Sequence, residues 1–136
     1  MTGEVINRLA EAIGYPDRIP SGVASFTLRV DGMEVVAEEI GNRLVLKYDL
    51  TSSEDIYDRL AEFAAGRMLK EAATLSAEPS SGGLFLWQGV DSHASAHDLM
   101  RLFETFMNSC EWWRERVDSI REARPQFGPD EMIMRP

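Results

Sequence analysis

Apolar positions recur at two different spacings in the first half of the chain, and each spacing predicts a different element. Between Thr2 and Gly14 they fall three or four residues apart, which predicts an amphipathic helix that Thr2 caps and Gly14 ends. Between Ser25 and Leu50 apolar and polar residues alternate, which predicts strands. Turn residues at Asp31-Gly32 and Gly41-Asn42 divide this stretch into a meander of three antiparallel strands.

The two turns also predict the strand register. Opposing apolar residues and opposing charges support it, because such cross-strand pairs stabilise a sheet. The predicted pairs are Val30–Met33, Arg29–Glu34, Leu28–Val35, Ala37–Leu46 and Val35–Tyr48. One face is then almost purely apolar, and it holds Phe26, Leu28, Val30, Met33, Val35, Ala37, Leu44, Leu46, Tyr48 and Leu50. The other face is mostly polar but contains Val36, Ile40 and Val45.

The second half of the chain predicts a helix, a hairpin and a longer helix. A capping box at Thr51–Glu54 starts a helix that runs to about Ala72 and has small residues in its middle. Residues 74–77 and 84–90 predict a hairpin, and its second strand is apolar on both faces. A cap at Ser95 begins the last helix, for which Pro125 predicts the end. Its apolar seam is Leu99, Phe103, Phe106, Cys110, Trp113, Val117 and Ile120.

The composition is that of one globular domain with an acidic surface. The chain has 136 residues, of which 44% are apolar, and 23 acidic residues outnumber 14 basic ones to give a net charge of −9. This balance argues against nucleic acid and anionic membranes as partners. The single cysteine allows no internal disulfide and fits a cytoplasmic location, and the N-terminus lacks signal-peptide and membrane-span features. We expect one domain over residues 1–123 and an irregular tail over 124–136.

Few residues are candidates for catalysis or metal binding. His93 and His97 are four residues apart and could share a helix face as metal ligands, but two solvated histidines at a helix start explain them better. Cys110 could be a nucleophile, but its place on the apolar seam favours a buried structural thiol. No carboxylates form an evident shielded pair, and Gly82-Gly83 lacks the lysine of a phosphate loop. We therefore predict a binding protein with no catalytic residue, cofactor or metal.

The order helix, three strands, helix, two strands, helix resembles the class I type III secretion chaperones of the Tir-chaperone type. Three stretches carry the resemblance, which covers roughly residues 3 to 121. Residues 6–16 are similar to the opening helix of that family and its glycine stop, residues 75–87 to its second hairpin, and residues 102–114 to its closing helix with a tryptophan. The tail after residue 123 departs from the family pattern.

The resemblance implies an α+β fold with a twisted antiparallel sheet flanked by helices, in a homodimer. It implies a chaperone that binds an extended N-terminal segment of a secreted effector, keeps it secretion-competent and presents it to the export apparatus. Two rivals stay open at this point. One is a chaperone-like regulatory module outside type III secretion, and the other is a small metal-dependent hydrolase that uses His93, His97 and Cys110.

Two sets of residues are candidates for these interactions. Cargo would wrap the outside of the domain, by adding a strand at a sheet edge or by placing apolar anchors in shallow pockets. The cargo candidates are Val36, Ile40 and Val45, with Val5 and Leu9 of the first helix, for which core packing is the stronger alternative. The dimer candidates are the small-residue helix positions Ala61, Ala64, Ala65 and Met68, with Phe85 and Trp87, whose face would be covered either by a helix of the chain or by a second subunit.

Overall fold

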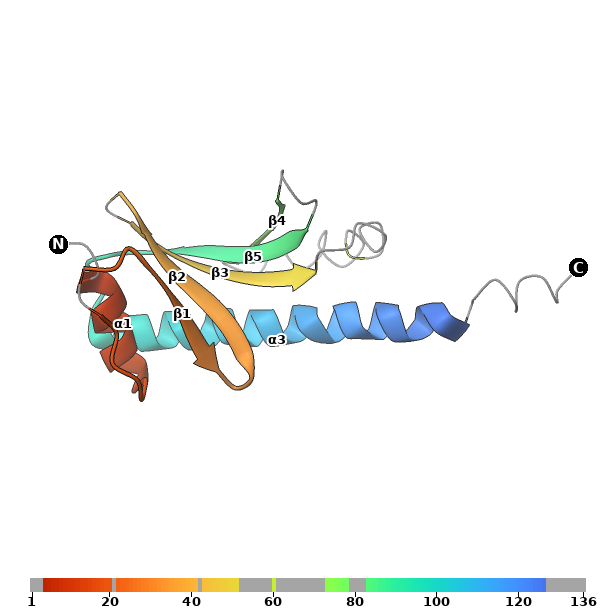
Figure 1. The fold of residues 1–136 in the computed structure, drawn as a ribbon, viewed down its shortest axis with the longest axis horizontal. Coiled ribbons are helices and arrows are strands. Elements are labelled where there is room, and N and C mark those ends of the chain that lie inside the picture. Colours follow the sequence, from red (N-terminus) through yellow and green to blue (C-terminus); the bar gives the residue numbers. More distant parts are fainter. Residues whose placement is uncertain are drawn as a thin grey trace, which may run out of the picture.

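In the part of the chain that the structure describes, the fold is a five-stranded antiparallel sheet with helices α1 and α3 on one of its faces. The computed structural model describes residues 4–20, 22–41, 43–51, 60, 73–78 and 83–126. Its elements are α1 (Glu4–Ile13), β1 (Ser25–Val30), β2 (Met33–Ile40), β3 (Arg43–Thr51), β4 (Thr74–Ala77), β5 (Leu84–Val90) and α3 (Ala96–Gln126) (Figure 1).

The strands follow the order β1-β2-β3-β5-β4, so the predicted meander is extended by the predicted hairpin. The long helix α3 runs along the sheet, and α1 packs against it at one end (Figure 1). We call the sheet face toward the helices the inner face. Its apolar residues form a single core with both helices, because a half-apolar sheet must bury that face against another layer.

The first hairpin has the predicted turn and register. Asp31 and Gly32 have φ angles of 52° and 76°, as a two-residue type I′ turn requires at both central positions. The structure confirms the predicted pairs between β1 and β2. It also confirms Ala37 opposite Leu46 between β2 and β3.

The predicted pair Val35–Tyr48 is wrong, because the ladder between β2 and β3 ends at Val36 and Lys47. Beyond that point β2 stays paired with β1, whereas β3 stays paired with β5 as far as Thr51. The hairpin end of β1 and β2 bends away from β3 and lies beside α3 (Figure 1). The pairing rules applied to the sequence assume a continuous ladder, so they could not predict this bend.

The structure confirms two predicted helix ends, at Gly14 and at Ser95, while Thr2, the predicted cap of the first helix, lies outside the described residues. Gly14 has a φ of 69°, and the amide of Tyr15 donates to the carbonyl of Ala10 at 2.9 Å, which closes α1. Ser95 caps α3, since its Oγ accepts a hydrogen bond from the amide of Asp98 at 3.2 Å. The predicted end of α3 at Pro125 is one residue short, because the helix continues to Gln126, and the predicted domain boundary at residue 123 falls within its last turn.

The seam of α3 is buried along its length, as predicted. Each of its seven residues is at most 7% exposed, and the largest is Trp113, which has no exposed surface. The predicted small-residue helix lies outside the described residues except for Leu60, which is helical and fully buried. None of the described helices combines the length and apolar character needed to cross a membrane.

Candidate interaction surfaces

The outer face of the sheet carries a row of apolar side chains that the described elements leave partly open. Strand alternation points Val36, Val45, Phe85 and Trp87 to this face, opposite the core residues that flank them. We call these four residues, with Ile40, the outer strip. Ile40 is 57% exposed and Trp87 is 36% exposed, which makes them the most exposed large hydrophobic residues in the described ranges. Exposed apolar clusters of this kind are typical of interaction sites.

Polar contacts hold the β5 side of the outer strip in place. The indole Nε1 of Trp87 donates a hydrogen bond to Ser76 Oγ at 2.8 Å, across the β4–β5 pair. The ammonium of Lys47 lies 4.4 Å from the centre of the Phe85 ring and 3.5 Å from a carboxylate oxygen of Glu78. These contacts give the aromatic side chains defined positions, which reduces the entropy that a partner must overcome when it binds them.

The structure joins two surfaces that the sequence treated separately. Phe85 and Trp87 were predicted for the dimer interface, and Val36 and Val45 for cargo. Lys47 pairs with Val36 on one side and with Trp87 on the other, so these residues form neighbouring rows on one face. The predicted dimer residues Ala61, Ala64, Ala65 and Met68 lie outside the described residues.

The two cargo candidates on α1 belong mainly to the core. Leu9 has no exposed surface, and Val5 is half-buried against the core cluster. The amide of Val5 donates to Glu39 Oε1 at 3.1 Å, which ties the start of α1 to β2. In the described chain Leu9 thus offers no side-chain surface to a partner.

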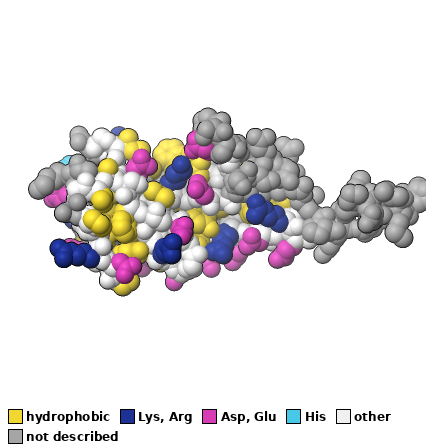
Figure 2. Space-filling model, viewed as in Figure 1, with side chains coloured by type: hydrophobic (Ala, Val, Ile, Leu, Met, Phe, Trp, Pro, Cys, Tyr) yellow, Lys and Arg dark blue, Asp and Glu magenta, His cyan; other side chains and the backbone are white. Residues whose placement is uncertain are grey.

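A second surface, which the sequence did not predict, lies where α1 ends. It is a groove of about 580 Å³ between the end of α1, the β1–β2 turn and α3. Figure 2 shows hydrophobic side chains gathered at this end of the molecule. The apolar residues that line the groove are Ile13, Tyr15, Pro16, Val30, Met100, Phe103 and Met107. These residues come from three separate segments, so no local pattern could group them.

Tyr15 orders this groove. Its ring meets Phe26 edge-on with centroids 6.3 Å apart, and its hydroxyl accepts a hydrogen bond from the backbone amide of Arg29 at 3.2 Å. Both contacts attach the segment after α1 to β1. β1 is an edge strand of the described sheet, so its outward backbone groups lie beside an apolar groove, apart from the Arg29 amide that Tyr15 engages, and this arrangement is suited to strand addition by an extended peptide.

The candidates for chemistry do not come together. His93 and His97 are exposed at the start of α3, whereas Cys110 is fully buried on its seam, as the apolar seam predicted. Among the residues that the structure describes, no three side chains of the metal-ligating types form a cluster.

Comparison with known proteins supports the fold but offers no close relative. No family model matches the sequence, and no curated protein matches it. The structure is similar to a chain in the HopA1–SchA chaperone–effector complex, with 17% identity over 82% of this chain and 91% of the other and a TM-score of 0.64.

Two further solved structures share the fold. One holds the Yersinia pestis type III secretion chaperone SycH with a fragment of YscM2: identity is 12%, coverage 82% of this chain and 98% of the other, and the TM-score 0.57. The other is the ExoU–SpcU heterodimer from the type III secretion system of Pseudomonas aeruginosa: identity is 19%, coverage 80% and 93%, and the TM-score 0.58. The chain therefore has the α+β fold that the sequence resemblance predicted.

Proposed function

We propose that this protein is a type III secretion chaperone. It binds an extended N-terminal segment of a secreted effector, keeps that segment soluble and competent for export, and presents it to the export apparatus. It acts by binding and not by catalysis, and it works in the cytoplasm. The observation that carries the proposal is an exposed apolar strip on a fold whose solved examples include chaperone–effector complexes.

Two surfaces provide different parts of cargo binding. The groove lies beside the edge strand β1, whose outward backbone groups, apart from the Arg29 amide bonded to Tyr15, have apolar side chains next to them, which suits an extended peptide. The outer strip supplies anchor positions for cargo, because Val36 and Val45 are only half-buried and Ile40 is 57% exposed. An unfolded effector segment contributes the apolar side chains that both surfaces need.

We propose that the protein is a homodimer. Phe85 and Trp87 lie on strand β5, next to the short edge strand β4, so a second copy can cover this part of the outer strip. The small-residue helix around Ala64 is the other predicted contact, since small side chains let helices approach closely. Val36, Val45 and Ile40 then remain for cargo.

Substitution of the outer strip tests the proposal. The double variant Val36→Asp and Val45→Asp places two charges where apolar contacts are needed. We expect it to lose co-purification with the N-terminal segment of the protein encoded by the adjacent gene, because desolvating an unpaired carboxylate is unfavourable. Ser25→Asp is the matched control, since it adds a charge to the same face at an exposed position outside the strip. A wild-type protein that fails to retain that segment would contradict the chaperone function itself.

Light scattering tests the dimer. We expect a dimer at micromolar concentration, and Trp87→Asp is expected to convert it to a monomer while Val36→Asp leaves it intact. A monomeric wild-type protein would remove the dimer from the proposal.

A further inference from the structure

The sheet is split between β2 and β3 at the end nearest the middle of α3. Val36 and Lys47 are the last paired residues, after which β2 continues through Val35 to Met33 and β3 continues from Tyr48 to Thr51 without pairing to each other. Each strand keeps its other neighbour, so both remain regular. The split therefore presents two facing strand edges whose ladder partners are missing.

Backbone groups point into this split. The two-residue turn makes Val30–Met33 a hydrogen-bonded pair, and hydrogen-bonded and non-hydrogen-bonded pairs alternate along an antiparallel ladder. The amide and carbonyl of Glu34 are thus directed away from β1 and toward β3. On β3, which faces β2 across the split, the same alternation directs the amide and carbonyl of Asp49 toward β2. Unpaired strand edges are templates for a further strand.

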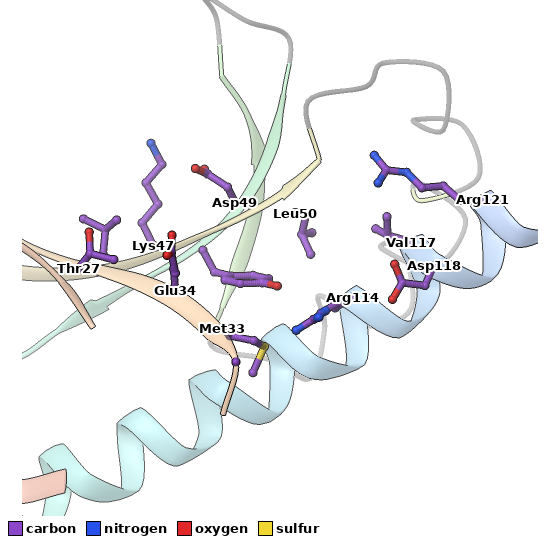
Figure 3. Close-up of a pocket in the computed structure, with 13 residues that line it drawn as sticks. Thr27, Met33, Glu34, Lys47, Asp49, Leu50, Arg114, Val117, Asp118 and Arg121 are labelled. Atoms are coloured by element: carbon purple, nitrogen blue, oxygen red, sulfur yellow. The ribbon is translucent and has the colours of Figure 1, made fainter. Parts of the chain in front are cut away.

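A cavity of about 440 Å³ fills the split and reaches α3. Its apolar wall comes from Met33 and Val36 on β2, Leu50 on β3 and Val117 on α3. Figure 3 shows these strands on one side of the cavity and the helix on the other. The cavity offers space for side chains of a segment that lies between the two strands.

Arg114 supplies a cationic group on the α3 side of the split. It extends from α3 toward Met33 (Figure 3), and its guanidinium hydrogen-bonds the Tyr48 side chain. The described residues give it no ion-pair partner. Two other charged groups of the lining are already engaged, since Glu34 pairs with Arg29 at 3.1 Å and Lys47 with Glu78 at 3.5 Å. A guanidinium with spare donors is suited to a carboxylate.

The lining also contains groups that oppose an anion. Asp49 and Asp118 are exposed carboxylates at the rim, and Arg121 is a second guanidinium on the same helix face. The lining is thus mixed in charge: Arg114 is exposed like the two carboxylates, and it stands beside the half-buried, neutral Tyr48 on the α3 side of the cavity. A segment with one carboxylate, placed beside Arg114, fits this arrangement better than a polyanion does.

We propose that the β2–β3 split is a docking slot for an extended segment of a partner protein that carries an aspartate or glutamate side chain for Arg114. The segment pairs its backbone with Glu34 and Asp49, places an apolar side chain against Met33 and Leu50, and presents its carboxylate to Arg114. The inference rests on the proposed function only for the source of this segment, which is the cargo.

A random-peptide phage library panned on the full-length protein tests the slot. We expect the wild type to enrich sequences that alternate apolar and polar residues around one Asp or Glu. We expect Arg114→Glu to enrich Lys or Arg at that place, and to bind the wild-type peptides at least about tenfold more weakly, since hydrogen bonds to charged groups are the strong ones. No enrichment, or the same peptides on both proteins, would overturn the proposal.

Two further variants separate the parts of the slot. Glu34→Pro removes an amide that faces the split, blocks strand addition there, and leaves the pairing with β1 in place; Glu34→Ala is its control. We expect only the proline variant to lose the peptides. Arg101→Glu reverses a charge on the exposed side of α3 outside the cavity, and we expect it to keep them. If Arg101→Glu lost peptide binding to the same extent as Arg114→Glu, the loss would come from the overall charge of the protein, and the proposal would be overturned.

Other occupants give different results. Selected peptides that match residues 127–136 would assign the slot to the chain's own tail, and a loss of dimer in Arg114→Glu would assign it to a second copy. Either result would overturn the proposal of a foreign partner. Failure of effector co-purification by the wild type leaves the panning result unaffected, so the two proposals fail separately.

Discussion

The inner and outer faces of the same sheet carry apolar residues in neighbouring positions but have different surroundings. On β3, Leu46 points to the inner face and has no exposed surface, whereas the adjacent Val45 points outward and is only half-buried. On β5 the fully buried Leu86 is followed by the exposed Trp87. Helices α1 and α3 account for the burial of the inner face, and no described element covers the outer strip.

This difference separates residues that stabilise the fold from residues that are available to a partner. A buried leucine stabilises the folded state by the transfer free energy of its side chain, and it fills space that would otherwise be a cavity. An apolar residue on an open face contributes little until another surface covers it. Covering the outer strip with a partner would therefore contribute binding free energy, which the described chain alone does not gain.

The pair Leu46→Ala and Val45→Ala should show the largest contrast. Removing Leu46 leaves a cavity under α3, and we expect a loss of about 2–5 kcal/mol in the free energy of unfolding. Removing the half-buried Val45 should cost below about 1 kcal/mol. Urea unfolding followed by circular dichroism measures both values. Equal losses would mean that the outer face is as well covered as the inner one.

Arg8 explains in part why the inner face is closed. Its guanidinium donates to the carbonyl of Ser92 at 2.7 Å and to that of Ala94, just before α3 begins. One side chain thus holds α1 against the segment that positions α3. We expect Arg8→Ala to lower the free energy of unfolding by about 1–3 kcal/mol, since carbonyl groups lose a charged donor.

The control for Arg8 is Arg101→Ala. Arg101 is an exposed arginine on α3, and its side chain makes no hydrogen bond or ion pair within the described ranges. Its removal should change the free energy of unfolding by no more than about 0.5 kcal/mol. If both variants lost equal stability, general charge effects and not the Arg8 contacts would be responsible.

Most of the inner face was predictable from the sequence, because it follows local rules. Alternation, the Asp31-Gly32 turn and the spacing along α3 depend on residues that are near in sequence. The buried seam through Trp113 followed from helical period alone. The predicted fold class and the order of elements are confirmed for the described residues.

The candidate interaction surfaces were less predictable, because they depend on how separate segments meet. The groove beside Tyr15 joins three segments, and the split between Val35 and Tyr48 arises from a bend that pairing rules omit. Leu9 shows the converse case, since an apolar residue on an amphipathic helix has the same pattern whether it faces the core or a partner. Only the tertiary arrangement separates these alternatives.

Tyr48 lies where the inner face meets the split, and its substitution is expected to have a small effect that depends on pH. Burial raises the pKa of its hydroxyl above 10, and this outweighs the opposing influence of Arg114. The folded state then holds the proton at pH values where the unfolded chain has released it. Its contribution to stability is complete below pH 10 and is lost as the pH rises through the raised pKa.

We therefore expect wild-type protein to lose stability above pH 10 more steeply than Tyr48→Phe. At neutral pH this variant should differ from wild type by only about 1 kcal/mol, because it loses one hydrogen bond to Arg114 at a half-buried site. Urea unfolding between pH 9 and pH 11 measures the two slopes. Parallel slopes would show that the Tyr48 hydroxyl is solvated like that of an exposed tyrosine. Water would then reach the bottom of the split, and the buried part of the inner face on β3 would end at Leu46.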